Sequence, residues 1–279
     1  MILVAGGTGR LGTLVVSRLV ARGLDVRVPT RDPERARHLP DGTEIVRGDV
    51  RDRASIERAM HGVTTAVSAV HGFAGPGRVT PESVDHAGNA NLIDVAAAAS
   101  ADVVMVSVVG ASANNPMALF GAKYAAEQHL RSSGTPWTIV RATAFMELWA
   151  EIMAKAPVLG RGENPINFVS VGDVAAVVER AVVDNSARGQ ILEVGGPQNL
   201  TFNEFAAVWQ EIVRGGPRKI RHVPRWLLRA MAPVARHARA AITMDTTDMT
   251  FDATATRAFF ADLPVTELRA ALSHTAIRQ

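Results

Sequence analysis

Short apolar runs alternate with longer segments of helical periodicity through the first two thirds of the chain. The runs predict β-strands at Ile2–Ala5, Asp25–Pro29, Glu44–Arg47, Thr65–Ala69, Val103–Ser107 and Thr138–Arg141. The segments between them predict helices near Leu11–Arg22, Pro33–His38, Ala54–Met60, Pro81–Ala99 and Met117–Ser132. Because these strands are apolar throughout rather than at alternate positions, the pattern indicates a parallel sheet with helices on both faces.

The alternation changes after Phe145. The following stretch predicts a loop, a short strand and a helix that begins near Ser170, and "GQILEVGGP" predicts a further strand. Thr201 and Glu204 have the spacing of a capping box at a helix start, and the remainder is expected to be mostly helical with no clear strand. We therefore expect a first domain at 1–155, to which 168–195 returns, and a smaller lobe at 196–279.

A glycine-rich turn joins the first predicted strand to the first predicted helix. Its glycines satisfy both GxxGxxG and GxGxxG. Between a strand and a helix these spacings are typical of a dinucleotide site, because glycine lets the backbone turn tightly and approach a pyrophosphate, while the helix start offers N–H groups to the phosphates. The predicted cofactor contacts are Gly6, Gly7, Thr8, Gly9, Arg10, Leu11 and Gly12. Gly12 is also expected to let the helix pack close to the sheet.

These elements together predict the fold class. It is α/β: a Rossmann-type, doubly wound parallel sheet with a small, mainly helical C-terminal substrate lobe. In such a fold the end of the second strand lies beside the adenosine ribose, where an acid selects NAD and a basic residue accepts the 2′-phosphate of NADP. Arg31 comes first there, whereas Asp32 precedes a proline in the setting of a helix N-cap. We therefore expect NADP, bound through Arg31, and keep NAD as the alternative.

Polar residues also follow the other strands. Asp49 and Val50, in "RGDVRD" after the third strand, are placed to meet the edge and the face of the adenine. The alternative for Asp49 is a loop carboxylate that caps local N–H groups. Ser68 and Ser107, at the ends of the fourth and fifth strands, belong to the carboxyl edge of the sheet and are expected to neighbour the cofactor.

Composition sets the broad class. A hydrophobic content of 47% and a charged content of 20% over 279 residues are typical of a globular protein. The chain has no apolar run of the ~20 residues that a membrane span needs, and no secretory signal is visible, so the expected location is the cytoplasm. Zero cysteines exclude disulfides and thiolate chemistry, and the eight histidines show no ligand spacing, so no metal is expected.

Charge is distributed unevenly. Eight basic residues and no acid lie between Glu211 and Asp245, whereas the rest of the chain carries 22 basic and 27 acidic residues. A membrane-surface helix, a nucleic-acid contact and a cover for an anionic ligand are alternatives to a lobe helix with solvated or paired arginines, which we favour. No DNA-binding motif accompanies the segment, so no nucleic-acid partner is expected.

Several stretches between residues 4 and 177 resemble one superfamily. They are "VAGGTGRLG", "TRDPERA", "GDVRD", "FGAKYAAEQHLRSSGTPWTIVRATAFME" and "VSVGDVAAV". Together they resemble the short-chain dehydrogenase/reductase superfamily, specifically its atypical NmrA-like and NAD(P)H:quinone-reductase-like members. The resemblance implies a cytoplasmic NAD(P)-binding Rossmann domain with a variable C-terminal lobe that shapes the substrate pocket. It does not single out a substrate.

The resemblance also implies a role for Lys123. Members of the wider superfamily use a Tyr-x-x-x-Lys pair, in which the tyrosine transfers a proton and the lysine binds the nicotinamide ribose. Lys123 matches the lysine, but Leu119 stands at the tyrosine position, and Tyr124 would point about 100° away around a helix. NmrA-like and isoflavone-reductase-like members likewise lack the tyrosine. Lys123 is therefore the predicted catalytic and cofactor-binding residue, with a solvated surface lysine as the alternative.

Candidate substrate contacts come from two regions. His71 and Phe73 lie in the glycine-rich loop after the fourth strand and could cover a substrate as a lid. Phe145, Met146 and Trp149 could form an apolar pocket wall. The alternatives are a solvated loop histidine and, for apolar residues at helical spacing, ordinary core packing.

Two functions follow from these features. The first is an NAD(P)H-dependent oxidoreductase that transfers hydride to a small apolar or aromatic acceptor, such as a quinone or an enone. The second is a non-catalytic NADP(H)-sensing regulatory protein of the NmrA type. The missing tyrosine favours the sensor, whereas Lys123 and the apolar pocket candidates favour the enzyme. A small-molecule substrate is the expected partner, and a homodimer is left open.

Overall fold

The chain divides into two units. Unit 1 comprises Met1–Arg141 and Val174–Glu193, and unit 2 comprises Ala142–Asp173 and Val194–Gln279. The structure, a computed structural model, describes residues 1–72, 79–216, 219–232, 236–254, 258 and 261–277. These units differ from the sequence-based division over 142–155, 168–173 and 194–195. Short strands in the first two stretches pair with each other outside the main sheet.

A seven-stranded sheet lies in the first part of the chain. Its strands are β1 (Ile2–Ala5), β2 (Val26–Thr30), β3 (Glu44–Arg47), β4 (Thr65–Ser68), β5 (Asp102–Val108), β6 (Trp137–Ala142) and β10 (Ile191–Val194). They lie in the order β10-β6-β5-β4-β1-β2-β3. The pairs β1–β2, β2–β3, β1–β4 and β4–β5 are parallel. The predicted Rossmann-type α/β fold is thus confirmed, since parallel neighbours require crossover helices.

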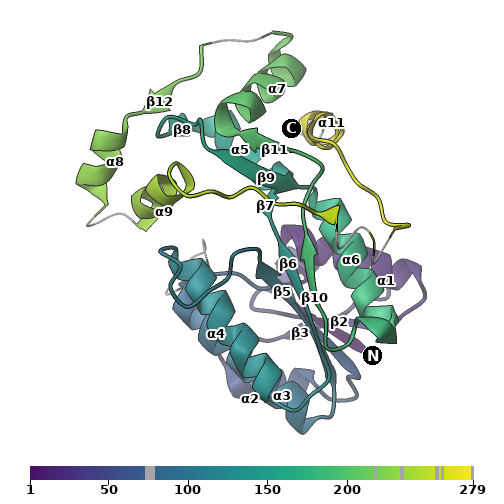
Figure 1. Cartoon of the computed structure of the whole chain (residues 1–279). Coiled ribbons are helices and arrows are strands. Elements are labelled where there is room, and N and C mark those ends of the chain that lie inside the picture. Colours follow the sequence, from purple (N-terminus) through teal and green to yellow (C-terminus); the bar gives the residue numbers. More distant parts are fainter. Residues whose placement is uncertain (73–78, 217–218, 233–235, 255–257, 259–260, 278–279) are drawn as a thin grey trace. The chain divides into compact units, whose positions relative to one another are not determined.

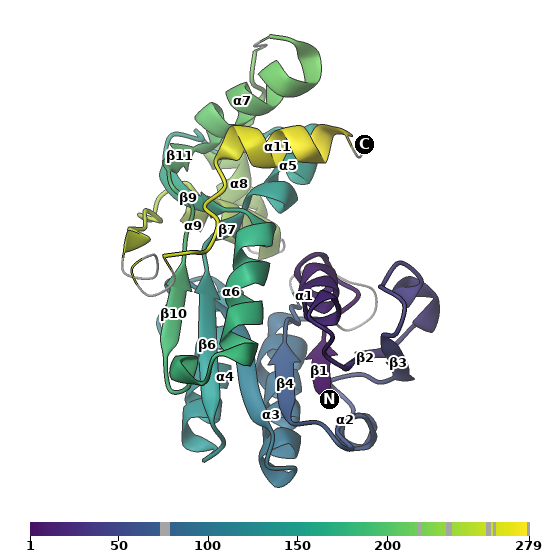
Figure 2. The ribbon, with the colours of Figure 1, turned by 90° about the vertical axis from the view of Figure 1, so that its right-hand side faces the viewer.

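Helices cover both faces of this sheet. They are α1 (Arg10–Ala21), the 3-10 helix η1 (Pro33–Ala36), α2 (Arg53–Ala59), the π-helical turn η2 (Pro81–His86), α3 (Ala87–Ala98), α4 (Ala118–Ser132), α6 (Val171–Val183) and the 3-10 helix η3 (Asn185–Ala187). Figures 1 and 2 show α1 and α6 on one face and α3 and α4 on the other. The doubly wound arrangement buries the central strands β1, β4 and β5 on both sides, which explains their continuous apolar runs, whereas the edge strand β3 has no buried residue.

Two of these helices begin as their sequences predict. The Thr80 hydroxyl accepts the N–H of Ser83, and the Ser83 hydroxyl accepts the N–H of Thr80, which forms a capping box before Pro81. The first six residues of the predicted helix, however, form the π-helical turn η2 rather than α-helix. The Asp32 carboxylate accepts the N–H of Glu34 and caps η1, as its position before a proline predicts.

The core of unit 1 lies between the sheet and these helices. Leu3, Ala66 and Ile139 in the strands pack with Leu92 and Leu130 from the helices, and none of the five is exposed. Burial of a leucine or isoleucine side chain contributes about 1.5–3 kcal/mol. This packing holds the sheet rigidly and so positions the residues at the strand ends.

Unit 2 is built from shorter elements. They are β7 (Ala144–Phe145), α5 (Met146–Lys155), β8 (Val158–Leu159), β9 (Pro165–Val169), β11 (Asn199–Thr201), α7 (Phe202–Arg214), β12 (His222–Val223), α8 (Arg225–Met231), α9 (Arg236–Met244) and α11 (Leu268–Ile277). Strand β9 pairs with β7 in parallel and with β11 antiparallel, and β8 pairs with β12 in parallel. The prediction of no strand in the remainder of the lobe was therefore wrong at β12, whose two residues are too few to show a pattern.

The unit 2 core contains a cluster of aromatic rings. Phe168 packs against Phe202 and Phe205, with ring centroids 5.7 Å and 4.9 Å away, and Trp149 lies 4.6 Å from Phe202. The predicted capping box of Thr201 and Glu204 is confirmed at the start of α7 and places these phenylalanines on the inner side of the helix. Among the described residues, no helix combines the length and the apolar character needed to cross a bilayer.

Candidate cofactor site

The strand order reverses at β1. This strand pairs in parallel with β2 on one side and with β4 on the other, where Ala5 lies opposite Ser68. In open α/β sheets, ligands bind outside the carboxyl ends of the strands at such a reversal. The glycine turn begins directly after Ala5 and therefore occupies this position.

Two glycines of the turn have no room for a side chain. Gly6 adopts φ +83°, and a Cβ built on it would lie 2.6 Å from the carbonyl oxygen of Ala69. A Cβ on Gly12 would lie 2.1 Å from the carbonyl oxygen of Gly6. The sequence predicts that Gly12 brings the helix close to the sheet, and the structure shows that the backbone it approaches is the turn itself. Glycine is required at both positions for the chain to close this tightly.

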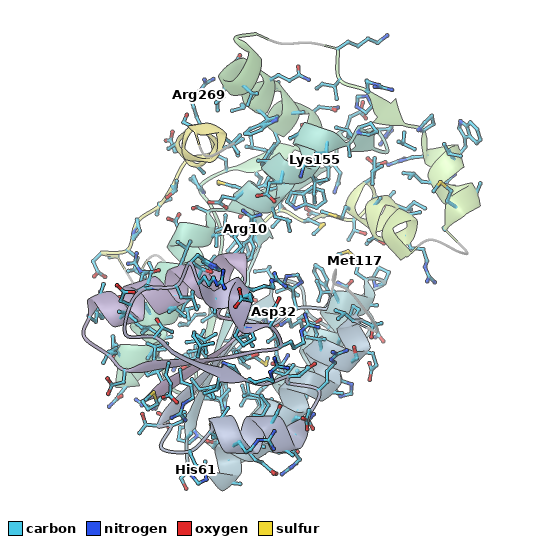
Figure 3. All side chains as sticks on the ribbon, turned by 180° about the vertical axis from the view of Figure 1, so that it is seen from behind. Arg10, Asp32, His61, Met117, Lys155 and Arg269 are labelled. Carbon is cyan, nitrogen blue, oxygen red and sulfur yellow. The ribbon has the colours of Figure 1, made fainter. Side chains whose placement is uncertain are left out.

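The amino end of α1 has no side-chain cap. Gly9 is the N-cap and supplies no side-chain acceptor, and the first turn contains no acidic residue. Gly9 and Arg10 are exposed, while Leu11 is buried and anchors the helix (Figure 3). The positive end of the helix dipole is therefore not compensated from within the helix, which suits the binding of a phosphate.

The end of β2 presents a basic residue to solvent. Arg31 is exposed and follows Thr30, whose hydroxyl bonds the backbone of Asp32. The Asp32 carboxylate is engaged with the N–H of Glu34, 3.1 Å away. Arg31 lies close enough to Asp49 to help lower the pKa of that carboxyl. Asp32, the acid that would select NAD, is thus engaged as a helix cap. Arg31, the basic residue that would accept the 2′-phosphate of NADP, is accessible.

Asp49 and Val50 are engaged with neighbouring residues. The Asp49 carboxylate accepts the backbone N–H of Arg51 at 3.0 Å and the Arg51 guanidinium at 2.7 Å. Burial alone would raise the pKa of Asp49, but these hydrogen bonds outweigh it and hold the pKa below its usual value. Val50 is buried, and its side chain packs where a Cβ on Gly88 would be. The local-capping alternative therefore describes Asp49 in this structure.

The two serines at the strand ends are buried with their hydroxyls committed. Ser68 donates to the amide oxygen of Asn89 on α3. Ser107 donates to the carboxylate of Glu127 on α4, which also binds the guanidinium of Arg141. Both hydroxyls thus tie the sheet to its helices, and their predicted proximity to the cofactor stays a prediction.

Lys123 lies in the interior of unit 1, not on a solvated surface. Only 3% of its area is exposed, and its ammonium donates to the carbonyl oxygens of Val70 at 2.8 Å and Val106 at 3.0 Å. The Asp85 carboxylate oxygen Oδ1 lies 3.1 Å from Nζ. An ammonium carries three N–H donors. Among the described residues, two carbonyl oxygens and one carboxylate oxygen lie within hydrogen-bond distance of it, at the carboxyl edge of β4 and β5.

Residues 6–185 match a family model described as NAD(P)H-binding. The chain belongs to the NAD(P)H-binding family. The matched segment contains the glycine turn, Arg31 and Lys123, so the predicted NAD(P) class of cofactor is confirmed.

Curated relatives with this domain include reductases. The (4-alkanoyl-5-oxo-2,5-dihydrofuran-3-yl)methyl phosphate reductase of Streptomyces griseus subsp. griseus is 33% identical over 215 residues, which are 74% of this chain and 72% of that protein. The NAD(P)H azoreductase of Xenophilus azovorans is 29% identical over 214 residues, again 74% and 72% of the two chains.

A solved structure supports the same fold. An NADPH-dependent quinone oxidoreductase from Escherichia coli, crystallised with NADPH, superposes with a TM-score of 0.80 over 98% of this chain and 99% of that chain, at 21% identity. At that identity the likeness concerns the fold alone. With the family match, it confirms the predicted resemblance to NmrA-like and quinone-reductase-like proteins.

Asp85 is a site residue that sequence reasoning missed in this NAD(P)H-binding domain. Its side chain is fully buried in η2, one helical turn before Asn89, and Leu92 and Ala96 continue the same face. Two polar residues on an otherwise apolar, inward-facing stripe were the available signal. The sequence pattern predicts only a helix start in this part of the chain.

The loop after β4 contributes one described candidate. His71 is exposed and follows Val70, whose carbonyl binds Lys123. The next residue, Gly72, donates its N–H to Asp85 Oδ2 at 2.6 Å. Phe73, the other predicted lid residue, lies outside the described residues. His71 is therefore brought near Lys123 along the chain, and its contact with substrate stays a prediction.

The three apolar candidates of the lobe belong to unit 2. Met146 is 1% exposed and Trp149 packs on Phe202, so both lie in the aromatic core of that unit. Phe145, the N-cap of α5, is half-buried. The core alternative therefore describes Met146 and Trp149, while Phe145 keeps an accessible surface within its unit.

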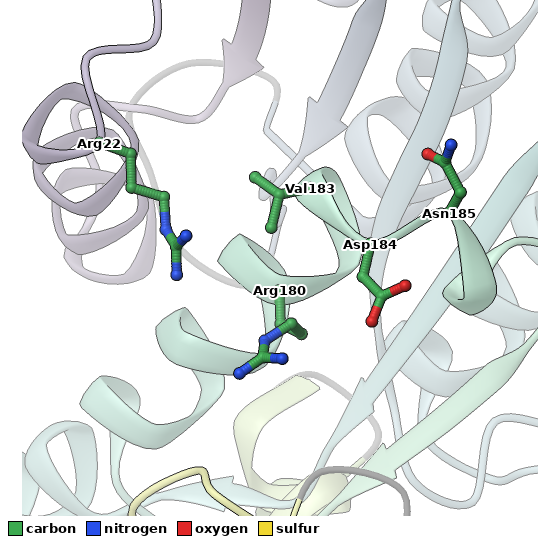
Figure 4. A pocket seen from close by; sticks show the side chains of 5 residues that line it. All are labelled: Arg22, Arg180, Val183, Asp184 and Asn185. Carbon is green, nitrogen blue, oxygen red and sulfur yellow. The ribbon is translucent and has the colours of Figure 1, made fainter.

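A surface pocket of about 450 Å³ lies elsewhere on unit 1. Arg22, Arg180, Val183, Asp184 and Asn185 line it (Figure 4). It adjoins the carboxyl end of α1, and a helix of 12 residues separates that end from the glycine turn by about 18 Å. The Arg22 guanidinium is already bound to Glu179. We assign no ligand to this pocket.

Proposed function

We propose that this protein is an NADPH-dependent reductase that transfers hydride to a small apolar or aromatic acceptor, such as a quinone or an enone. The observation that carries the proposal is the buried Lys123 ammonium, held beside Asp85 at the carboxyl edge of β4 and β5. Burying a charge is expensive unless the charge is used or paired. In open α/β sheets ligands bind at this edge, so a buried cation here is placed to meet the cofactor.

The cofactor would be held at three points. The backbone of the glycine turn and the amino end of α1 would bind the diphosphate, and Arg31 would bind the 2′-phosphate of NADPH. The Lys123 ammonium would bind a hydroxyl of the nicotinamide ribose or an oxyanion that develops on the acceptor. When bound, NADPH supplies the hydride, and the protein orients it.

The acceptor class follows from what the chain lacks. Leu119 stands four residues before Lys123, where the wider superfamily has a proton-donating tyrosine. Acceptors whose reduced form takes its proton from water are therefore favoured over simple ketones. Quinones meet this condition. The relatives described above are named as reductases, which supports an enzyme over a sensor.

A turnover assay tests the proposal. Purified protein is mixed with NADPH and a panel of quinones and enals, and the loss of NADPH absorbance is followed. The informative variant is Lys123→Met combined with Asp85→Asn, because Lys123→Met alone would strand a buried carboxylate and destabilise the fold. We expect the double variant to lose about tenfold or more in kcat/KM, the value of a charged hydrogen bond.

A matched control is the exposed lysine of α5. Lys155→Met makes the same change in side chain on the surface of unit 2 and should leave turnover unchanged. If wild-type protein binds NADPH tightly but reduces no acceptor, the reductase is refuted and the NADP(H)-sensing alternative takes its place. If the double variant turns over as fast as wild type, Lys123 has no part in the chemistry.

A further inference from the structure

We propose that Asp85 is the positioning residue for Lys123: it supplies the counter-charge that holds the buried ammonium at the sheet edge where the cofactor is proposed to bind. The inference rests on the proposed binding of NADPH at this edge. It concerns a residue outside the glycine turn and outside the Tyr-x-x-x-Lys pattern, on a different helical segment from Lys123.

The first step is the charge balance. Lys123 is buried, and two of its hydrogen-bond acceptors are neutral backbone carbonyls. Carbonyl dipoles alone do not compensate a full buried charge. Asp85, whose side chain is 0% exposed, is the carboxylate that approaches it, at 3.1 Å from Oδ1 to Nζ. Removal of this carboxylate would therefore leave the ammonium buried without a counter-charge.

The second step is the geometry of the pair. Nζ and Oδ1 lie 3.1 Å apart, which is within hydrogen-bond distance, and both side chains are buried. The attraction between opposite charges is stronger in such a buried setting than in water. The ammonium therefore has three acceptors around it, two carbonyl oxygens and the Asp85 carboxylate, which together fix the position of Nζ.

The third step is how Asp85 is held. Its other oxygen, Oδ2, accepts the N–H of Gly72 at 2.6 Å, and its backbone carbonyl accepts the amide of Asn89 at 2.7 Å. A Cβ on Gly72 would lie 2.2 Å from the carbonyl oxygen of Thr80, so this backbone approach requires glycine. Asp85 also lies in the π-helical turn η2, and π-turns within helices occur frequently at functional sites. The carboxylate is therefore fixed between the loop after β4 and Lys123.

The test is a double-mutant cycle on NADPH affinity. Asp85→Asn, Lys123→Met and the combination of both are compared with wild type by fluorescence titration with NADPH. Asp85→Asn keeps the size of the side chain and an oxygen for Gly72, but removes the charge. We expect it to raise the Kd for NADPH about tenfold, and Lys123→Met to do at least the same. Because Asp85 acts through Lys123, the combination should be no weaker than Lys123→Met alone.

The same proteins give a second readout without cofactor. In urea, Lys123→Met should unfold at a lower midpoint than Asp85→Asn with Lys123→Met, since only the single variant has an uncompensated buried carboxylate. This comparison keeps the proposal testable if Asp85→Asn alone folds poorly. The matched control is Glu82→Gln, the same acid-to-amide change on the exposed side of η2, which should alter neither the Kd nor the midpoint.

Three results would overturn the inference. One is a Kd for Asp85→Asn within twofold of wild type. Another is multiplication of the two single effects in the combined variant, which would make Asp85 independent of Lys123. The third is a combined variant less stable than Lys123→Met. None of these readouts uses turnover, so a protein that binds NADPH but reduces no acceptor would refute the proposed reductase and leave the assignment of Asp85 standing.

Discussion

Two buried carboxylates, one in each unit, have opposite surroundings. Asp245 in unit 2 is 4% exposed, and its Oδ1 accepts the N–H groups of Arg161 and Gly162, each at 3.0 Å. Its Oδ2 binds the guanidinium of Arg225. Asp85 in unit 1 is buried at least as deeply, but the cation beside its Oδ1 is the Lys123 ammonium, 3.1 Å away.

The two carboxylates are therefore expected to have different roles, Asp245 in stability and Asp85 in cofactor binding. Around Asp245 every partner belongs to the chain, so the carboxylate closes the loop at 160–162 and holds Arg225 in place. A pocket of about 320 Å³ lies beside it, and three of its lining residues, Arg161, Arg225 and Asp245, already serve this network, so we assign no ligand there. At the sheet edge of unit 1, the carboxylate instead pairs with Lys123, the residue proposed to bind the cofactor. Changes at Asp245 should therefore affect stability, and changes at the edge should affect cofactor affinity.

The largest expected effect is that of Asp245→Ala. It leaves the Arg225 guanidinium without its carboxylate and frees two N–H groups, so we expect a loss of about 3 kcal/mol in the free energy of unfolding of unit 2. Urea unfolding followed by tryptophan fluorescence measures it, because Trp149 and Trp209 lie in that core. The Kd for NADPH, measured below the transition, should stay within twofold of wild type.

The control for this change is Asp248→Ala. Asp248 is exposed and bonds only the adjacent backbone and hydroxyl of Thr250 among the described residues, so its removal should leave the midpoint unchanged. A large rise in the Kd for NADPH in Asp245→Ala, with the midpoint preserved, would show that Asp245 affects cofactor binding and not stability.

The next effect is that of Gly12→Ala. Its new Cβ would sit 2.1 Å from the Gly6 carbonyl oxygen, so the turn must open and the diphosphate position shifts. We expect NADPH affinity to fall by more than about tenfold, from the strain of overpacking. Gly121→Ala, in α4, meets no atom within 4 Å and should instead stabilise the protein by about 0.5 kcal/mol. Equal NADPH affinity in both variants would contradict a ligand at the turn.

A smaller, selective effect is expected from Arg31→Ala. The change removes an exposed cation from the end of β2, so the Kd for NADPH should rise about tenfold while the Kd for NADH hardly moves. Thermal-shift titrations with each cofactor measure both. Arg37→Ala, an exposed arginine already paired with Glu34, is the control. Parallel losses for NADPH and NADH would show that Arg31 does not contact the 2′-phosphate.

The smallest effect concerns the ion pairs of Glu179 with Arg18 and Arg22, at the carboxyl end of α1. Burial would raise the pKa of Glu179, but hydrogen bonds from Arg22 and Arg18 outweigh it and hold the pKa below its usual value. A lowered folded-state pKa gives stability above the unfolded-state value of about 4.3, and this stability is lost as the pH falls through the folded-state pKa. Both arginines are over a third exposed, so the gain is below about 1 kcal/mol.

The variant Glu179→Gln tests whether this stability is lost as the pH falls. It should be slightly less stable than wild type at pH 7, with the gap closing in acid, when urea midpoints are compared across pH. A gap that widens as the pH falls would mean that the carboxylate is destabilising in the folded state. NADPH affinity at pH 7 should not change, because Glu179 lies away from the glycine turn.

Much of this protein can be predicted from sequence because its determinants are local. The strands of unit 1 have one signal, continuous apolar character, and the glycine turn, the Asp32 cap and the capping boxes each depend on neighbours within a few residues. These signals were sufficient for the Rossmann-type sheet and for the NAD(P) class of cofactor. Lys123 was identified because it matches the lysine of a family pattern. No local feature of the sequence predicted that it would be buried.

Only the tertiary structure determined which polar groups meet. Lys123 and Asp85 are separated by 38 positions, and the crossing of α4 over η2 places their charges 3.1 Å apart. Ser107 and Asp49, predicted at the cofactor, proved to have their polar groups engaged by Glu127 and Arg51. Such pairings depend on packing between elements, which is set by the whole core. A sequence pattern shows which kinds of partner each polar residue can bind. The fold determines whether that partner comes from the chain or from a ligand.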